Sequence, residues 1–435
     1  MEIKESTLSF FGLLIIAGLG IMAVFAPRKY ATLPLIASAC FITYGQQIVI
    51  ADLNFTGLRM IILLGWLRVF IRNELEIRWN LIDKLILIYA GFSFLKLFQV
   101  SSQDEGLSLL VGHLGFLYNL IGIYFLFRIF IRDYDDIELA IRYLGLCLII
   151  PSGFMIFEMV TGKNMFSIFG GVDEFSLIRD GYVRCQGPFR HPIMAGTVGA
   201  ISMPLFVGLL RSKGRGKALA LIGGIGSTAM VVASHSTGPA LSYGFGLIGL
   251  LCWYCRDHMK KIRWMLLVSL VALHVVMKAP VWYLFSRVSD LIGGGGWHRS
   301  FLIDQAIAHI NEWWIVGTSK TGHWMPYSLA IDPEAADLTN QFIAEGVSGG
   351  LIRIALFIII IGVCFRTIGK TLQRMEGLSH GQRILTWSLG VSLFSHVISF
   401  FSVSYYDQTI MMWYMCLSCI AAVQTLSVRT QVGMS

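Results

Sequence analysis

Charged residues are scarce in this chain. Asp, Glu, Lys and Arg make up only 14% of its 435 residues, whereas 55% are hydrophobic. Soluble proteins average about 25% charged residues, so an ordinary water-soluble fold is excluded. The net charge of +8 comes from basic residues that are spread over separated loops and form no single patch. We therefore expect no nucleic-acid partner.

Neither the cysteines nor internal repeats of the sequence indicate a particular function. Of the eight cysteines only Cys185 lies outside the apolar runs of the chain, so no disulfide is expected in the polar segments. Cys252 and Cys255 have the spacing of a redox or metal-binding pair, but they lie inside an apolar run, where ordinary packing is the expected role. The sequence shows no internal repeat of the kind that many transporters have.

Long apolar runs are what the sequence has in abundance. Many approach the roughly 20 residues with which a helix crosses about 30 Å of hydrocarbon, and such segments must be helical because lipid offers no partners to backbone amides. The runs predict an all-α fold, a polytopic transmembrane helical bundle of about 12–14 spans that forms a single integral membrane domain over residues 1–435. The thirteen runs are 8–26, 33–50, 58–72, 82–100, 108–131, 137–158, 192–210, 218–234, 239–255, 264–283, 348–365, 384–401 and 408–427.

The positions of Lys and Arg predict how this bundle is oriented. They gather in three short loops, 211–217, 256–263 and 366–383, which the positive-inside rule places in the cytoplasm. Counting spans from these loops places four segments on the extracytoplasmic side: 159–191, 235–238, 284–347 and 402–407. Thirteen spans with a cytoplasmic C-terminus would put Met1 outside, and one span more or fewer would reverse this.

The first extracytoplasmic loop, 159–191, ends in a basic cluster. Arg184, Arg190 and His191 occur within eight residues, directly before the run that begins at Pro192. Proline suits the first turn of a helix, and a helix N-terminus favours anions. Snorkelling at the membrane boundary would explain any one of these side chains, but the three together predict a phosphate-binding site.

The large extracytoplasmic loop, 284–347, holds the other candidates. Its glycines at 293–296 predict a hinge or tight turn. Apolar residues from Phe301 to Ile310 recur at the spacing of a short amphipathic helix on the outer surface. Further along, the loop contains an imidazole, several carboxylates and an indole, which are the groups that sugar chemistry uses.

A series of short motifs follows the chain from the first loop to the end of the second. It comprises Glu158, Thr161, Gly162 and Asn164; Arg184, Gly187, Phe189, His191 and Pro192; Ser234, His235, Ser236, Thr237 and Gly238; Arg299; Ile315, Val316 and Gly317; and Asn340, Glu345, Gly346, Gly349 and Gly350. In this order the motifs resemble the O-antigen ligase and polymerase superfamily, bacterial membrane glycosyltransferases that join lipid-linked oligosaccharides. The resemblance runs over roughly residues 150–365.

Two departures from that pattern separate the branches of the superfamily. Many members carry Arg where this chain has Thr237, and ligases often carry a basic His where it has Thr339. The resemblance therefore favours a polymerase, acting on an O-antigen or an exopolysaccharide, over a ligase that transfers the glycan to lipid A core.

The resemblance implies an inverting transfer from an undecaprenyl-diphosphate-linked oligosaccharide on the periplasmic face of the bacterial inner membrane. Fixed guanidinium groups can stabilise the departing pyrophosphate, and Arg184 and Arg299 are the candidates. The acceptor hydroxyl needs a base. His323 is the first choice, because an unperturbed imidazole has a pKa of about 6.5, and Asp337 is the second. The candidate substrate-binding residues are Glu158, Arg190, His191, Ser236, Trp297, Trp324 and Asn340, with the two indoles as surfaces for sugar stacking.

No cofactor is expected, and no metal, because the two long extracytoplasmic loops contain no Asp-x-Asp pair. Membrane lipid is the expected surrounding, and the resemblance implies a chain-length regulator and a flippase as protein partners. The competing hypothesis is a transporter or flippase that moves a lipid-linked sugar or an anionic solute, with Arg59, Arg68 and Arg128 along its path. A structural role in an envelope assembly is a third hypothesis.

Overall fold

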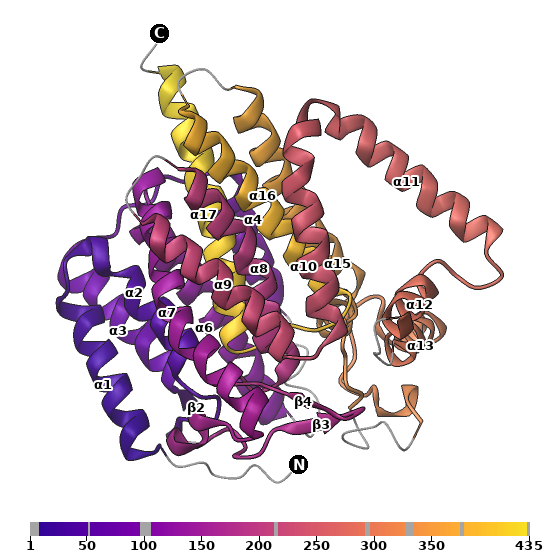
Figure 1. Cartoon of the computed structure of the whole chain (residues 1–435), viewed down its shortest axis with the longest axis horizontal. Helices are drawn as coiled ribbons and strands as arrows, with labels where there is room; N and C mark the ends of the chain where they lie inside the picture. Colours follow the sequence, from indigo (N-terminus) through magenta and orange to yellow (C-terminus); the bar gives the residue numbers. More distant parts are fainter. Residues whose placement is uncertain are drawn as a thin grey trace.

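Helices account for nearly all of the regular structure (Figure 1). The computed structural model describes residues 8–50, 53–95, 106–212, 216–291, 296–326, 335–374 and 378–432, and within them the predicted all-α fold class is confirmed. The α-helices are α1 (Phe10–Phe25), α2 (Thr32–Phe41), α3 (Gly57–Ile71), α4 (Leu81–Leu95), α6 (Gly106–Phe130), α7 (Tyr134–Thr161), α8 (Pro192–Arg211), α9 (Lys217–Ala233), α10 (Thr237–Leu251), α11 (Met259–Val276), α12 (Tyr283–Leu291), α13 (Trp297–Ala308), α14 (Ile310–Trp313), α15 (Gln341–Gln373), α16 (His380–Phe400) and α17 (Gln408–Val432). The 3₁₀ helices are η1 (Arg28–Tyr30), η2 (Met165–Phe169), η3 (Cys252–His258) and η4 (Gly322–Trp324). Two antiparallel hairpins pair β1 (Gln47–Ile50) with β2 (Leu53–Thr56) and β3 (Leu177–Arg179) with β4 (Tyr182–Arg184).

Five of the described helices are long and apolar enough to cross a membrane. They are α7, α8, α15, the stretch Leu110–Phe130 of α6 and the stretch Gln408–Leu426 of α17, whereas α1 and α9 are apolar but shorter. Each of the thirteen expected runs overlaps a helix. These features support a membrane protein with several spanning helices.

The expected span 33–50 is wrong in its second half. Helix α2 ends at Phe41, the backbone becomes extended at Ile42, and β1 then pairs with β2. The extended segment is held by a tertiary contact, in which the Thr43 hydroxyl donates a hydrogen bond to the Gly170 carbonyl at 2.6 Å. The side chain of Gln46 donates another to the neighbouring carbonyl of Phe169. An apolar run alone cannot reveal such a competing partner.

The segment 284–347 is largely helical rather than a plain loop. It contains α13 and α14, and α15 already begins at Gln341. The expected amphipathic helix from Phe301 corresponds to most of α13, which buries Leu302 against Ile343 and Val347 in a small second core. Gly293, Gly294 and Gly295 of the expected hinge lie outside the described residues.

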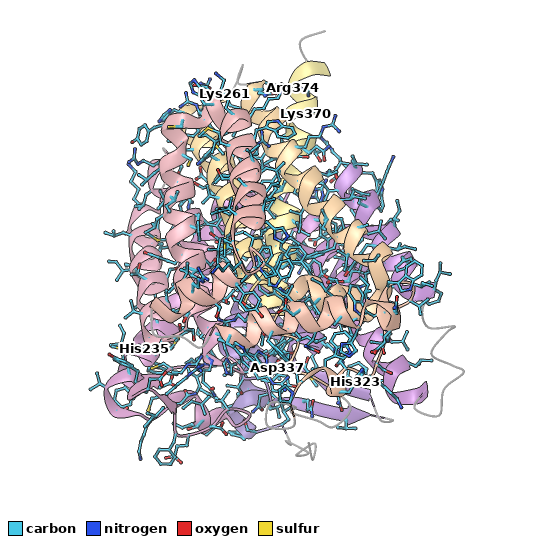
Figure 2. All side chains as sticks on the ribbon, turned by 90° about the vertical axis from the view of Figure 1, so that its right-hand side faces the viewer. His235, Lys261, His323, Asp337, Lys370 and Arg374 are labelled. Carbon is cyan, nitrogen blue, oxygen red and sulfur yellow. The ribbon has the colours of Figure 1, made fainter. Side chains whose placement is uncertain are left out.

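The polar side chains divide the molecule into two ends (Figure 2). Lys261, Lys370 and Arg374 lie at one end, which we call the basic end. His235, Asp337 and His323 lie at the opposite end, which we call the site end. The three labelled residues of the site end come from separate parts of the chain, so the fold gathers distant segments there.

Close contacts between small residues hold the bundle together. Helix α8 packs against α9, α10 and α16, and α7 packs against α9 and α2. A Cβ atom at Gly199 would lie 2.5 Å from the carbonyl oxygen of Ser227, and one at Gly145 would lie 2.9 Å from that of Leu219. Such close backbone approach is typical of helix pairs in membranes, where small residues let dispersion contacts form.

Three ion pairs lie within the bundle. Arg128 binds Asp83 at 3.0 Å, Arg68 binds Glu74 at 2.8 Å, and Arg353 of α15 binds Glu345 at 2.6 Å. A buried charge without a partner would be costly. These pairs therefore allow charged residues to lie inside an apolar bundle.

The N-terminal third of α15 packs directly, backbone against backbone, on the segment that follows α14. We call this contact the seam. Backbone hydrogen bonds run from Thr318 to Val347 and from Leu351 to Trp314, each 2.8 Å long. A Cβ atom at Gly317 would lie 2.1 Å from the Val347 carbonyl oxygen. Gly350, where α15 kinks with φ +70°, approaches the carbonyl of Ile315 in the same way.

Helix α11 stands away from the rest of the bundle (Figure 1). None of its residues is buried, and apolar side chains such as Leu266, Val271 and Val275 are exposed. It leads from the bundle to the site-end helices α12 and α13.

Candidate functional site

Arg184 is presented by a short hairpin at the site end. Asp180 and Gly181, both with positive φ, form the two-residue turn between β3 and β4, as an Asp-Gly pair favours. The backbone N–H of Cys185 donates to the Ala233 carbonyl at 3.0 Å and ties the end of β4 to α9. The hairpin therefore fixes Arg184 beside the turn between α9 and α10.

The chain after Arg184 is shaped by one buried carboxylate. Glu158, near the end of α7, accepts hydrogen bonds from the backbone N–H groups of Gln186 at 3.0 Å and Gly187 at 2.9 Å. It also accepts one from the Ser176 hydroxyl at 2.9 Å. Glu158 thus organises the loop that carries the arginine.

The Arg184 guanidinium lies at the start of α10. One terminal nitrogen donates to the Ser236 hydroxyl at 2.9 Å, while the buried Nε has no hydrogen-bond partner among the described residues. Burial, together with the nearby charge of Arg179, lowers the pKa of Arg184. The Arg184 guanidinium is therefore fixed in a poorly solvated position and still has N–H groups that can donate to a ligand.

The first turn of α10 has no side-chain cap, and the Ser402 hydroxyl packs against it at Gly238. Ser236 occupies the N-cap position, but its hydroxyl donates to the Ser234 carbonyl at 2.9 Å and forms no side-chain cap. Pro239 has no N–H, and the N–H of Ala240 donates to the Ser236 carbonyl at 3.2 Å. The N–H groups of Thr237 and Gly238 therefore remain without partners in the helix, and the helix dipole favours an anion there.

Arg299 reaches the same turn from α13. A Cβ atom placed on Gly238, the second residue of α10, would lie 3.9 Å from Nη2 of Arg299. Within the described ranges no acceptor hydrogen-bonds the Arg299 guanidinium, and no carboxylate pairs with it. Burial and the charges of Arg179 and Arg184 lower the pKa of Arg299 to about 10, against an opposing effect of Asp337, so the group stays protonated at neutral pH.

Asp337 lies among cations without a direct ion pair in the described structure. The residue is exposed, yet its surroundings remove enough water from the carboxyl to raise its pKa, although His298, Arg190 and Arg299 all act to lower it. A carboxylate with a raised pKa beside an arginine pair is a candidate proton acceptor.

Arg190 links Asp337 to a second carboxylate. Its guanidinium lies over the rings of Tyr44 and Tyr406, 4.5 and 5.1 Å from their centroids, and donates to the Tyr44 hydroxyl at 3.2 Å. Its positive charge acts on both Asp337 and Asp407. Arg190 therefore joins the cluster that contains Asp337.

Asp407 is the residue that the sequence analysis missed. It has φ +50°, its Oδ2 is buried without a hydrogen-bond partner among the described residues, and burial raises its pKa to about 6 despite Arg190 and Arg59. It borders a small cavity with Arg59, Asn119 and Gln408. The available signal was its place in the short extracytoplasmic turn 402–407, where a carboxylate follows two tyrosines.

Three predicted binding residues have local structural roles here. His191 is the N-cap of α8, and its Nδ1 accepts from the N–H of Ile193 at 3.2 Å. Burial and two nearby arginines lower its pKa to about 4, so it is not the cation expected at neutral pH. Asn340 caps α15 through its Oδ1, and the carboxylate of Glu158 is occupied as described above.

The other predicted residues lie elsewhere at the site end. His323 pairs with Glu312 at 3.0 Å rather than with an arginine. Trp324 is only 1% exposed, so its ring faces are covered by protein. Trp297 is 49% exposed and stacks on Phe301 with centroids 4.8 Å apart, which leaves an indole face for a ligand.

The structure thus brings Arg184, Arg299 and Ser236 together, with Asp337 and Arg190 nearby. The arrangement can bind a multivalent anion at the start of α10 and accept a proton beside it. One further cluster, His309, Glu312 and His323, has the residue types of a metal site. Comparison of the chain with protein-family models and with curated proteins finds no match.

Proposed function

We propose that this protein is a membrane glycosyltransferase that joins oligosaccharide units carried on a polyprenyl diphosphate into a surface polysaccharide. The observation that carries this proposal is that Arg184 of β4 and Arg299 of α13 both approach the uncapped first turn of α10. Two guanidinium groups with free donors at a helix N-terminus suit a diphosphate better than a single phosphate.

The proposed role of the two arginines is to stabilise the negative charge that develops on the leaving diphosphate. When the bond between the anomeric carbon and the diphosphate breaks, negative charge grows on the leaving oxygen. Donors that are already fixed and poorly solvated stabilise this charge without reorganisation, and one such donor contributes about 10²- to 10³-fold in rate. Arg184 and Arg299 supply these donors.

Asp337 is the proposed base. An acceptor hydroxyl attacks the anomeric carbon from the face opposite the diphosphate, and Asp337 takes its proton, with inversion of configuration. Its raised pKa and its closeness to Arg299 support this role. His323, the first choice from the sequence, pairs with Glu312 and has no contact with the two arginines in the described structure.

The proposed setting is the inner membrane of a bacterium, with about 12–14 spans and the site end facing the periplasm. The separation of the basic end from the site end supports this orientation through the positive-inside rule. The polyprenyl tail then lies between apolar helices, and the proposed reaction needs no metal. A chain-length regulator and a flippase remain the proposed protein partners.

Two alternatives are kept. A ligase that transfers the glycan to lipid A core would use the same donor site, and Thr339 weighs against it. A flippase needs polar residues through the bilayer, but Arg68 and Arg128 are already paired with Glu74 and Asp83. That pairing favours an enzyme over a carrier.

The test is transfer by purified protein supplied with a lipid-linked repeat unit. We expect a ladder of products on a gel from wild type and from the control Arg263→Ala, which changes an exposed arginine of the basic end. Arg184→Ala and Arg299→Ala should each lower the yield by about 10²-fold or more. A single transfer product would favour the ligase.

Lysine variants separate geometry from charge. Arg184→Lys and Arg299→Lys should be nearly as inactive as the alanine variants, because an ammonium group cannot form the bidentate contact of a guanidinium. Full activity in either alanine variant would refute the proposed site, and full rescue by lysine would reduce the role of that arginine to charge alone.

A further inference from the structure

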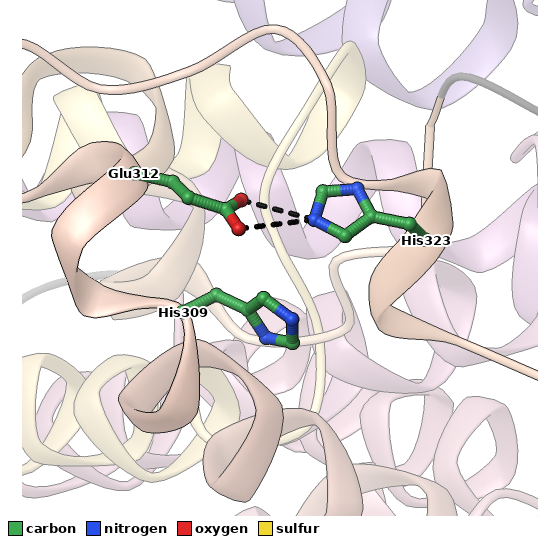
Figure 3. A group of neighbouring side chains, drawn as sticks. All are labelled: His309, Glu312 and His323. Carbon is green, nitrogen blue, oxygen red and sulfur yellow. Dashed lines mark hydrogen bonds and ion pairs between the residues drawn. The ribbon is translucent and has the colours of Figure 1, made fainter.

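A second cluster of side chains lies at the site end, where α14 meets η4 (Figure 3). His309, Glu312 and His323 point toward one another, and their ligand-type atoms all lie within 4.8 Å of one another. Nε2 of His323 is 3.2 and 3.0 Å from the two carboxylate oxygens of Glu312. None of these three residues belongs to the proposed diphosphate site.

His309 and Glu312 are each oriented by a further contact. Nδ1 of His309 lies 2.9 Å from the Gln305 carbonyl, to which it donates its proton, so the lone pair of Nε2 is free. Oε2 of Glu312 accepts a hydrogen bond from the Trp324 indole at 3.1 Å. The His309 ring also stacks on Trp324, with centroids 5.7 Å apart. Metal-binding histidines commonly donate their second ring N–H to a carbonyl, and metal-binding carboxylates commonly accept a further hydrogen bond. His309 and Glu312 have these supporting contacts.

We infer that His309, Glu312 and His323 form a binding site for one divalent zinc-class ion. Two imidazoles and one carboxylate are ligands that Zn²⁺ accepts readily. Bonds of about 2.0–2.1 Å in a tetrahedron place ligand atoms about 3.4 Å apart, so small rotations of the two rings bring the three atoms into position. The fourth coordination position is open to water, because the residues lie at the surface.

The ion would clamp the chain on which Asp337 depends. Binding joins α14 to η4, and Thr321, just before η4, accepts a hydrogen bond from the N–H of Ala336 at 3.0 Å. Ala336 is the neighbour of Asp337. The ion is thus a structural element beside the proposed reaction and takes no part in the transfer, and its binding can be measured whether or not the protein is a glycosyltransferase.

The inference is tested by metal binding to the full-length protein without a histidine tag. The protein is purified in detergent, stripped with a chelator, and titrated with Zn²⁺ by calorimetry and with Co²⁺ by visible absorption. We expect one equivalent of either ion to bind, and the Co²⁺ spectrum to show a low-coordinate site. Zn²⁺ should also raise the thermal unfolding midpoint of the stripped protein.

Variants assign the site. Glu312→Gln and His323→Gln change exposed side chains and should weaken Zn²⁺ binding by at least about 100-fold, whereas Trp324→Phe should weaken it by about 10- to 100-fold through loss of the indole donor. His258→Gln, which changes an exposed histidine outside the cluster, should bind as wild type does. Elution as a single species in size-exclusion chromatography shows that each variant is folded. Absence of saturable binding at one equivalent, or wild-type affinity in the double variant Glu312→Gln with His323→Gln, would overturn the inference.

Discussion

Replacing Asp407 by Asn should make the protein more stable at neutral pH. Burial raises the pKa of Asp407 from an ordinary value of 3.8 to about 6, against the influence of Arg190 and Arg59. A difference of about 2 pKa units between the folded and the unfolded chain corresponds to about 3 kcal/mol. That is the approximate cost of keeping this carboxylate ionised inside the folded protein.

The sign of the pH dependence follows from the raised pKa. Well below pH 4 the carboxyl is protonated in both states, and its favourable contribution to stability is fully present. As the pH rises the unfolded chain ionises first, so stability falls until the folded carboxyl also ionises at about pH 6. Asn cannot ionise, and it adopts the left-handed backbone of position 407, with φ +50°, as readily as Asp. The gain from Asp407→Asn should therefore be less than about 1 kcal/mol at pH 4 and reach about 3 kcal/mol above pH 7.

The assay is thermal unfolding of detergent-solubilised wild type and variant across this pH range. Asp180→Asn is a matched control, because Asp180 also has a positive φ of 53° but is exposed at a hairpin turn. It should show no pH-dependent gain. An Asp407→Asn protein that is less stable than wild type at pH 7.5, or whose gain is the same at pH 4 and pH 7.5, would refute the reasoning. A simultaneous loss of glycan transfer would show that the carboxylate serves the site.

Three further outcomes are expected. Asp337→Asn should lower the rate of transfer by about 10²- to 10⁴-fold, and an unchanged rate would show that Asp337 is not the base. Because the pKa of Asp337 is raised, the wild-type rate should increase with pH over a range above that of an ordinary carboxyl group. Glu158→Gln should lower the free energy of unfolding by about 1–3 kcal/mol, since its amide nitrogen would face a backbone N–H, and a wild-type denaturation midpoint would contradict this. Asp83→Ala should cost about 3–5 kcal/mol by leaving Arg128 buried without its carboxylate. The double variant Asp83→Ala with Arg128→Met should recover much of that loss, so a double variant as unstable as the single one would count against this explanation.

The order of apolar runs along the chain explains which features the sequence could predict. Apolar runs identify helices because backbone groups in lipid have no other partners, and counting helices places Arg184 and Arg299 at one end. No such rule locates Asp407, whose unusual pKa depends on what packs around it. The burial of Trp324 and the pairing of His323 with Glu312 likewise depend on how α14 and η4 meet, and neighbouring residues in the sequence do not determine that contact.

The same limit explains the early end of α2. The run 33–50 is apolar enough for a helix, but Thr43 finds a partner in a distant carbonyl. The apolar pattern predicts the helix, but it does not show the contact between distant segments that holds Thr43 in extended backbone. His191 and Asn340 illustrate this at residue level, since polar side chains next to a helix start act as caps before they are available to a ligand.

The seam between Gly317 and Gly350 has a consequence for variation in this protein. The nearest atoms that a new methyl group would meet at these two positions belong to the backbone, which cannot rotate away as a side chain does. Both positions should therefore remain glycine in any related chain that keeps α13 and α14 in this orientation. A related chain with a larger residue at either position would have to place α13, and with it Arg299, differently.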